Sequence, residues 1–333
     1  MSKVTPAARA AADPAPKDPM EPGTVTPPTS SKPVSRLGDT VFSGLATWSG
    51  IIILVVLALV AAFLLWQGAP ALIAPAEELP YGSFWPWVGP LVFGTVWAAF
   101  LALVMAVPVS IGIALFISHY APRRLAAGLG YVIDLLAAVP SVVFGLWGIS
   151  VLAPALQPAY SWLADNLGFI PLFAPPASGT GRTIFTAAVV LAVMILPIVT
   201  ALSRELFLQT PRLHEEAALA LGATRWEMIR TAVLPYARPG LVSAAMLGLG
   251  RALGETMAVA MVLSPALLIS FALLQPTNPN TIAANIALSF PESYGLGVNQ
   301  LIASGLVLFV ITLAVNMIAR WIVSRRKDFS GAN

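Results

Sequence analysis

The sequence predicts an all-α integral membrane protein with six transmembrane helices. Hydrophobic residues make up 58% of the 333 residues and charged residues only 10%. Soluble domains are more polar than this, so the chain belongs in a bilayer. Apolar runs long enough to cross about 30 Å of hydrocarbon, at about 1.5 Å per residue, support the same class. These runs cover residues 43–66, 90–118, 128–153, 183–202, 240–264 and 301–323.

The positions of the cations predict the orientation of these helices. If the N-terminus is inside, the inner segments hold all but Arg182 and Arg251 of the 18 Lys and Arg residues. Cytoplasmic segments of membrane proteins carry this excess. We therefore expect a multi-pass protein of the bacterial cytoplasmic membrane with both termini cytoplasmic. The same topology explains the positive charge without nucleic acid binding, for which there is neither a basic stripe with stacking aromatics nor a motif.

The ends of the chain differ in composition from its middle. Residues 1–40 contain eight prolines among small and charged residues, which predicts a disordered cytoplasmic tail. Residues 41–327 form the predicted transmembrane domain, and 328–333 a short C-terminal tail. The chain has no cysteine, and its two histidines, His119 and His214, are far apart, so we expect no disulfide and no metal site.

Three segments between the runs are expected on the outer side. Residues 68–89 contain tryptophans typical of a membrane interface, and 154–182 are rich in Pro and Gly. A third segment, 265–300, includes a possible short helix at 281–290. Proline also falls inside three predicted spans, where it removes a helical hydrogen bond and predicts a kink. These prolines are Pro108, Pro140 and Pro197.

The most informative segment is EEAALALGATRWEMIRTAVLP, from Glu215 to Pro235, within a polar loop at about 203–239. The pattern predicts two short helices joined at Gly222, which can adopt a left-handed turn. The second helix has an apolar side, and we expect Pro235 to end it. The apolar side consists of Trp226, Met228, Ile229, Val233 and Leu234.

This segment resembles the EAA loop of ABC importer permeases, whose pattern is E-A-A, three residues, G, nine residues, I-x-L-P. Ala232 stands where the pattern has Ile. The resemblance implies a type I importer fold and a short helix that docks in a groove of a cytoplasmic ATPase. The matching positions are Glu216, Ala217, Ala218, Gly222, Leu234 and Pro235.

The chain has no ATPase motif of its own. Three of the four lysines lie within residues 1–40 and the fourth is Lys327, and none follows the glycine pattern of the phosphate-binding loop G-x-x-x-x-G-K-[ST]. We therefore expect a transport subunit that is not an enzyme. Its energy would come from another polypeptide through the loop around Glu216.

Two charged residues lie inside the fifth predicted span, in GLGRALGETMAVAMVL from Gly248 to Leu263. Arg251 is expected about 18 Å into the span, and Glu255 one turn further on the same face. Charges inside a membrane are costly, so the pair should face a partner helix or a water-filled route. Two interpretations stay open: the two side chains neutralise each other, or they line the route of an anion. A guanidinium fork suits tetrahedral oxyanions.

The run RALGETMAV, with DLLAAVPSVVFGLWG from Asp134 to Gly148, is similar to the PstC-type permeases of phosphate-specific ABC importers over about residues 40–327. The resemblance implies a PstA-type second permease, two PstB-type ATPase subunits that use ATP and Mg, and an external PstS-type phosphate-binding protein. It implies no cofactor on this chain. It also points to Arg251 and Glu255 as residues needed for phosphate passage. Asp134 matches too, although stabilisation of a helix N-terminus explains it equally well.

Other functions remain open from the residues alone. A permease for sulfate or molybdate would share the EAA loop, and an ion-coupled secondary transporter would need intramembrane charges but no ATPase. A membrane scaffold would transport nothing. Selectivity could come from Glu255, because protonated phosphate can donate a hydrogen bond that sulfate cannot, or from the external binding protein alone.

Overall fold

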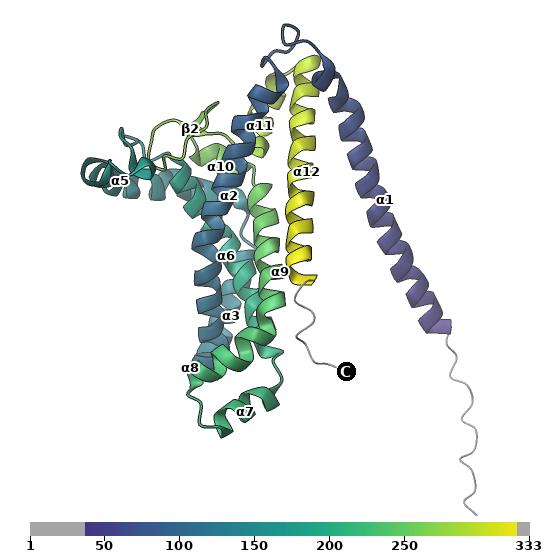
Figure 1. The fold of residues 1–333 in the computed structure, drawn as a ribbon, viewed down its shortest axis with the longest axis vertical. Coiled ribbons are helices and arrows are strands. Elements are labelled where there is room, and N and C mark those ends of the chain that lie inside the picture. The colour runs from purple at the N-terminus through teal and green to yellow at the C-terminus, as the bar shows by residue number, and fades with distance from the viewer. Residues whose placement is uncertain (1–36, 325–333) are drawn as a thin grey trace, which may run out of the picture. The chain divides into compact units, whose positions relative to one another are not determined.

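The computed structural model describes residues 37–324, which are helical along most of their length (Figure 1). Most of the predicted tail at 1–40 and all of the predicted tail at 328–333 lie outside the described residues, and α1 already begins at Leu37. The α-helices of the described range are α1 (Leu37–Ile73), α2 (Phe84–Leu115), α3 (Arg123–Ala137), α4 (Ser141–Trp147), α5 (Ala153–Leu167), α6 (Ile184–Leu208), α7 (Arg212–Ala220), α8 (Arg225–Met228), α9 (Leu234–Leu253), α10 (Met257–Val262), α11 (Ile282–Ser289) and α12 (Leu296–Ser324). Two short strands, β1 (Pro265–Ala266) and β2 (Asn278–Pro279), pair in parallel.

Six helical stretches in the described range are long and apolar enough to cross a membrane, which confirms the predicted class. Five of them overlap the predicted spans with shifted ends, and the third is displaced. The stretches are Thr40–Ile73, Phe84–Tyr120, Ser141–Leu167, Ile184–Leu208, Arg225–Leu253 and Leu296–Trp321. The chain also divides into two compact units inside α1, between Val56 and Leu57. The elements from α2 onward belong to the second unit.

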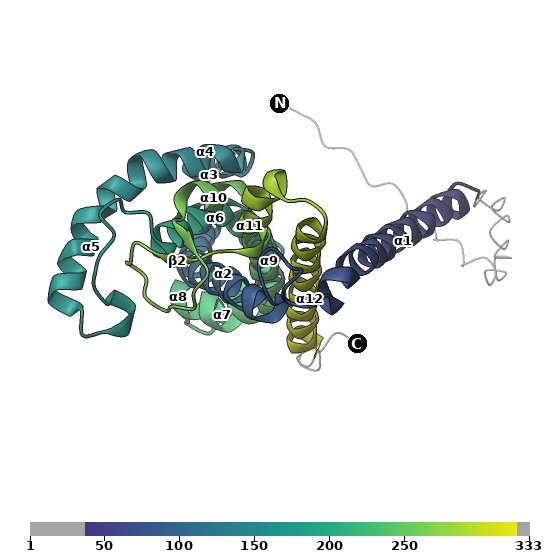
Figure 2. The same cartoon turned by 90° about the horizontal axis from the view of Figure 1, so that it is seen from above.

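The predicted third span, 128–153, is wrong because the helix is broken before Pro140. Proline has no N–H and disfavours the helical conformation of the preceding residue, so α3 ends at Ala137 and a new helix starts at Ser141. Figures 1 and 2 show α4 and α5 lying across one end of the bundle instead of along it. The loop predicted at 154–182 is therefore helical up to Leu167, with a proline tolerated in the first turn of α5.

The other two prolines lie where the sequence predicts. Pro108 is inside α2 and Pro197 is inside α6. The two helices are joined near these prolines by the buried Ser110, whose hydroxyl donates to the backbone carbonyl of Leu196 at 3.2 Å. A polar side chain thus links two apolar helices where proline interrupts their regular hydrogen bonding.

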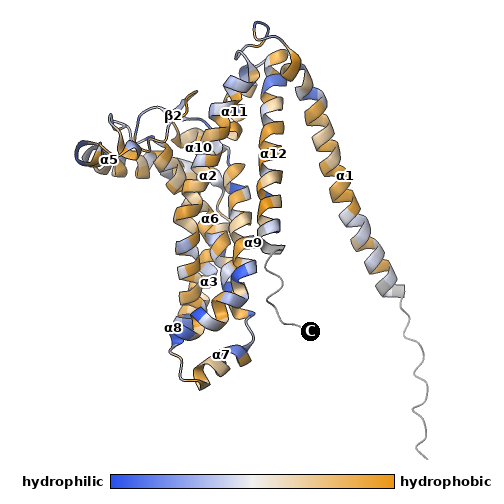
Figure 3. Cartoon of the chain, viewed as in Figure 1, coloured by the Kyte–Doolittle hydropathy of each residue, from blue (hydrophilic) through white to orange (hydrophobic). Residues whose placement is uncertain are grey.

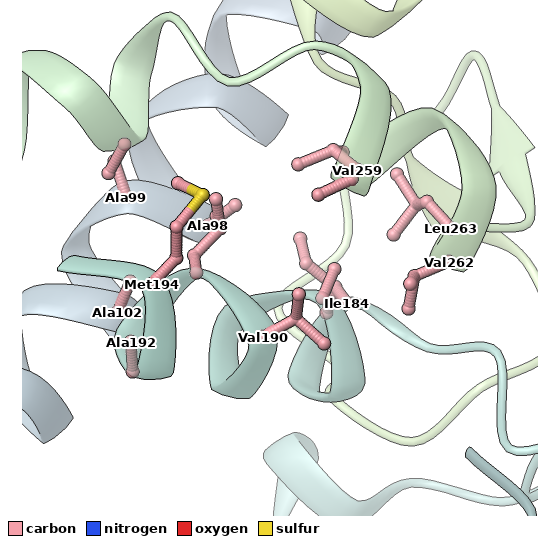
Figure 4. Close-up of a cluster of buried hydrophobic side chains, with 14 of the residues drawn as sticks. Ala98, Ala99, Ala102, Ile184, Val190, Ala192, Met194, Val259, Val262 and Leu263 are labelled. Atoms are coloured by element: carbon pink, nitrogen blue, oxygen red, sulfur yellow. The ribbon is translucent and has the colours of Figure 1, made fainter. Parts of the chain in front are cut away.

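The core of the second unit forms around α6, which is largely buried between α2, α9 and α10 (Figure 4). The side of α2 that packs against it is made of alanines, which let two helices approach closely. These alanines are Ala98, Ala99, Ala102 and Ala106. Val190 of α6 packs in the same cluster as Val259 and Val262 of α10.

At the end of the bundle that carries β1, β2 and α11, buried polar side chains fix the long segment between α10 and α12. The Asn278 amide oxygen accepts the backbone N–H of Ile184 at 2.8 Å, and the Thr95 hydroxyl accepts that of Ile282 at 2.9 Å. The Arg182 guanidinium donates to the carbonyl of Leu263 at 2.8 Å. Helix α11 follows Thr281, as predicted, and the Thr281 hydroxyl caps it.

At this same end, the first turns of α2 pack against α12. Phe84, Trp87 and Leu91 share a buried cluster with Leu301 of α12. From here α12 runs toward the opposite end of the bundle, which carries α7 and α8 and gathers hydrophilic residues (Figures 1 and 3). Trp87 is buried and stacks on Tyr81, so it serves the core and not a membrane interface.

Candidate functional site

The polar segment between α6 and α9 folds as two short helices, α7 and α8, as predicted. Gly222 joins them with φ of +87°, which confirms the left-handed turn. A Cβ at this position would meet no heavy atom within 4 Å, so the conformation alone favours glycine. Helix α8 begins with a capping box in which the Thr224 hydroxyl accepts the N–H of Glu227 and the Glu227 carboxylate accepts the N–H of Thr224. The pattern T-x-x-E in the sequence is the signal for this cap.

The prediction that Pro235 ends the second helix is wrong. A π-helical segment, Ile229–Val233, follows α8 and leads directly into α9, so the chain is helical from Arg225 to Leu253. Proline is tolerated in the first turn of a helical segment, and the wider π turn precedes Pro235 at the point where its missing N–H would interrupt a regular helix. The second helix of the loop and the fifth span are therefore one continuous helix.

The apolar side of this helix packs on its own bundle. Met228, Ile229 and Val233 are buried in one cluster with Ala114 of α2 and Phe207 of α6. Trp226, predicted for the same side, is exposed. Burial of the first three residues fixes α8 rigidly to α2 and α6, which a helix that transmits force would need.

Helix α7 is different, because it has no buried residue. It exposes 74% of Leu213, and the following Leu221 is 90% exposed. Of the six motif positions, four are exposed: Glu216, Ala217, Gly222 and Pro235. Ala218 and Leu234 are half-buried and pack against the cluster of Met228 and its neighbours. The motif thus divides into an exposed surface and two residues that hold it to the bundle.

One contact ties α7 to the bundle and was missed from the sequence. The His119 Nε2 atom lies 3.6 Å from a carboxylate oxygen of Glu215, and residues 37–324 contain no other pair of basic and acidic side chains at salt-bridge distance. The Ser118 hydroxyl lies 2.7 Å from the other ring nitrogen of His119. The histidine side chain is only 10% exposed. No sequence signal joins residues so far apart in the chain.

The second candidate site lies at the end of α9, where the structure changes the predicted geometry of Arg251 and Glu255. Helix α9 ends at Leu253, and Glu255 lies in a break before α10 instead of one turn further on the same face. Glu255 is 9% exposed, and its carboxylate accepts the N–H of Ala258 at 3.1 Å. No ion pair links it to Arg251, which is exposed, within the described chain. Direct neutralisation of one charge by the other is therefore excluded in this conformation.

Arg251 instead faces a groove of about 950 Å³ between α6, α9 and α12. A second guanidinium, that of Arg320 on α12, lines the same groove and was not predicted from the sequence to line the route. Neither arginine has a carboxylate partner in residues 37–324, and Glu255 is not part of the lining. The groove is lined by Ile198, Val242, Ser243, Met246, Leu247, Gly250, Arg251, Asn316, Ala319 and Arg320.

Asp134 lies elsewhere. It is exposed in the last turn of α3, so the explanation by a helix N-terminus is wrong. Within residues 37–324 no group of three or more His, Asp or Glu side chains could hold a metal ion. The arrangement offers an anion-attracting groove in the bundle and an exposed helical surface at one end of it.

Comparisons with known proteins show the family of this chain. Residues 106–328 match the family model described as "Binding-protein-dependent transport system inner membrane component". The chain is 47% identical over 304 residues to "Phosphate transport system permease protein PstC 2" of Mycobacterium tuberculosis, covering 86% of this chain and 92% of that protein. It is 39% identical over 318 residues to "Phosphate transport system permease protein PstC" of Xylella fastidiosa, covering 91% and 97%.

Among solved structures, a chain of a bacterial alginate ABC transporter in complex with alginate pentasaccharide-bound periplasmic protein has a similar fold. The TM-score is 0.55 at 17% identity, and the match covers 89% of this chain and 100% of that one. At this identity the likeness concerns the fold alone. It agrees with the type I importer permease architecture expected from the sequence.

Proposed function

Because this chain belongs to the family of inner membrane components of binding-protein-dependent transport systems, we propose that it is the permease subunit of an ATP-driven importer of inorganic phosphate. The assignment of phosphate as the substrate rests on the similarity to relatives named phosphate permeases, which are at least 39% identical along most of both chains. Family membership also argues against a secondary transporter, which needs no binding protein.

In this proposal Arg251 offsets the charge of phosphate that has lost its hydration shell. The support is its position in a groove with no carboxylate in the lining. Glu255 would act from the break between α9 and α10, where its carboxylate already orders the first turn of α10. A carboxylate there can accept the hydroxyl proton of protonated phosphate, a hydrogen bond that sulfate cannot donate. Uptake of Glu255→Gln with phosphate and sulfate in competition tests this: unchanged discrimination contradicts it.

The exposed surface of α7 and the Gly222 turn would receive the ATPase. Glu216 and Ala217 are exposed on α7, and the helix has an apolar surface that its own bundle leaves uncovered. An amphipathic helix of this kind suits a groove on a partner. We propose a PstA-type permease, two PstB-type ATPase subunits and a PstS-type binding protein as partners. ATP and Mg would act on the ATPase, with no cofactor on this chain, and both termini would be cytoplasmic.

The coupling then follows from the way the loop is attached. When ATP binding closes the ATPase subunits, α7 and α8 would move with them. Because α8 continues through the π-helical segment into α9 without a break, its displacement reaches Arg251 at the far end of the same helix. The route between the two permeases would thus change its accessible side as the ATPase closes and opens.

The test is uptake of labelled phosphate, with sulfate as a control, by cells that lack the gene and carry wild type, Glu216→Lys or Arg251→Ala. We expect wild type to restore the uptake of phosphate but not of sulfate. Both variants should be present in the membrane, and their phosphate uptake should fall to the background level. Matched controls are Glu292→Lys, an exposed acid far from α7, and Arg124→Ala, an exposed arginine outside the groove, which should transport normally.

Two outcomes would contradict the proposal in different ways. If wild type restores no phosphate uptake, the assignment of phosphate as the substrate is wrong, and the assignment of the chain to its transport family is unaffected. If phosphate uptake is restored but Glu216→Lys transports as well as wild type, the docking surface is wrong. Loss of the ATPase from the purified complex with Glu216→Lys, an exposed position of α7, is the matching biochemical result.

A further inference from the structure

The groove between α6, α9 and α12 contains a second positive residue that the family resemblance does not assign. Arg320 of α12 lines it together with Arg251, and no acidic side chain among residues 37–324 does. Like charges that share a groove without a counter-ion repel each other, and a guanidinium at the centre of a membrane segment, as expected for Arg251, costs about 2.5–3.5 kcal/mol on the insertion scale. An anion bound between the two residues would offset both the repulsion between the guanidinium groups and the cost of placing a guanidinium in the membrane.

The neutral lining near Arg320 suits the same ligand. Asn316 precedes Arg320 by four residues, which places both side chains on one face of α12. Ser243 of α9 lines the groove as well. An amide and a hydroxyl can donate to oxygens that a guanidinium leaves free, and an arginine fork matches two oxygens of a tetrahedral anion. The available chemistry therefore fits a phosphate group.

The groove also has a direction. On α9 its lining runs from Val242 to Arg251, a length of about 14 Å at about 1.5 Å per residue. Arg251 is near the end of α9 that is farther from α7 and α8, whereas α12 runs toward them and carries Arg320 close to its C-terminal end (Figure 1). The two arginines therefore occupy successive positions along one groove.

We propose that Arg320, with Asn316, forms a second binding position for the transported phosphate, between Arg251 and the end of the bundle that carries α7 and α8. The inference rests on the proposed phosphate transport. Arg251 holds the anion at the first position, and Arg320 draws it on when the route opens toward the ATPase side. The phosphodiester of an anionic lipid offers the same chemistry, and the experiment below separates the two sources.

The first experiment uses the complete complex in vesicles of phosphatidylcholine alone or with phosphatidylglycerol, with the phosphate-binding protein and ATP supplied. Phosphate uptake per ATP hydrolysed is measured for wild type, Arg320→Ala, Arg320→Lys and the control Arg124→Ala. We expect Arg320→Ala to lower this ratio at least tenfold in both lipids, Arg320→Lys to recover part of it, and Arg124→Ala to match wild type.

The second experiment uses the absence of cysteine from the chain. Met246→Cys introduces a single thiol in the groove without removing a proposed ligand, and a charged methanethiosulfonate reagent measures its accessibility in the assembled complex. We expect inorganic phosphate to slow the modification several-fold and chloride at equal ionic strength to have no effect. This measurement does not depend on Arg320→Ala folding normally.

The outcomes distinguish the failure of each idea. If wild type transports phosphate and Arg251→Ala does not, but Arg320→Ala does so normally, the second position is wrong and the proposed function stands. If Arg320→Ala loses only a stimulation by phosphatidylglycerol, the groove near Arg320 holds a lipid headgroup. If phosphate gives no protection to the thiol, phosphate does not bind there. Either result overturns the proposal. If wild type carries no phosphate, the proposed function itself fails.

Discussion

Replacing Gly222 by alanine tests whether the turn between α7 and α8 positions the surface proposed to receive the ATPase. The residue has φ of +87°, and a Cβ there would have no heavy atom within 4 Å. The cost is therefore confined to the backbone, where a left-handed conformation costs an L-residue about 1–2 kcal/mol. This corresponds to about a 5–30-fold shift in the equilibrium between the native turn and its alternatives.

Helix α7 can relieve this strain by moving, because it has no buried residue to lose. We therefore expect the bundle to remain folded while the exposed surface is displaced. The Gly222→Ala permease should bind the ATPase subunit about 5–30-fold more weakly, with phosphate uptake reduced in parallel. Gly222→Asn should lose less, because asparagine tolerates left-handed backbone. Titration of the purified permease pair with the ATPase measures the affinity.

The chain offers a matched control in Gly82, between α1 and α2. Its φ is +76°, and a Cβ there would also meet nothing within 4 Å. Gly82→Ala therefore imposes the same kind of strain far from α7 and should leave the ATPase affinity unchanged. The reasoning is refuted if Gly222→Ala binds the ATPase like wild type, or if Gly82→Ala weakens binding equally.

Three further substitutions test other parts of the structure. In Gly94→Ala the new Cβ would overlap a backbone carbonyl next to β2, so we expect little assembled complex by size-exclusion chromatography. The control Gly89→Ala, which has open space in the same helix, should assemble normally. Equal yields of the two variants would contradict the packing described. Thr224→Ala removes the cap of α8, at a cost of about 1 kcal/mol, and should accelerate amide exchange at the start of that helix, whereas Thr224→Ser should not. His119→Ala breaks the contact with Glu215 and should raise the ATP hydrolysed per phosphate carried; an unchanged ratio would show that this contact does not position α7.

The sequence by itself determined the features that depend on local composition and turn chemistry. Hydropathy predicted an all-α membrane protein with six candidate spans. This works because exposing polar groups to lipid is costly, so that every segment that crosses the membrane must be apolar. Glycine at 222 and threonine at 281 predicted a left-handed turn and a helix start, and both are where expected. The spacing of the EAA motif identified α7 and its turn, because these motif residues shape only the helix and turn in which they lie.

The tertiary structure decided which of these elements continue and which residues meet. Pro140 breaks a helix, whereas Pro235 lies in a continuous one, because a π-helical segment precedes it. Arg251 and Glu255, four residues apart, are separated by the end of α9, so that one lines the groove and the other caps α10. Arg320 reaches that groove and His119 reaches Glu215 only through the packing of helices distant in sequence, and no local pattern contains this information.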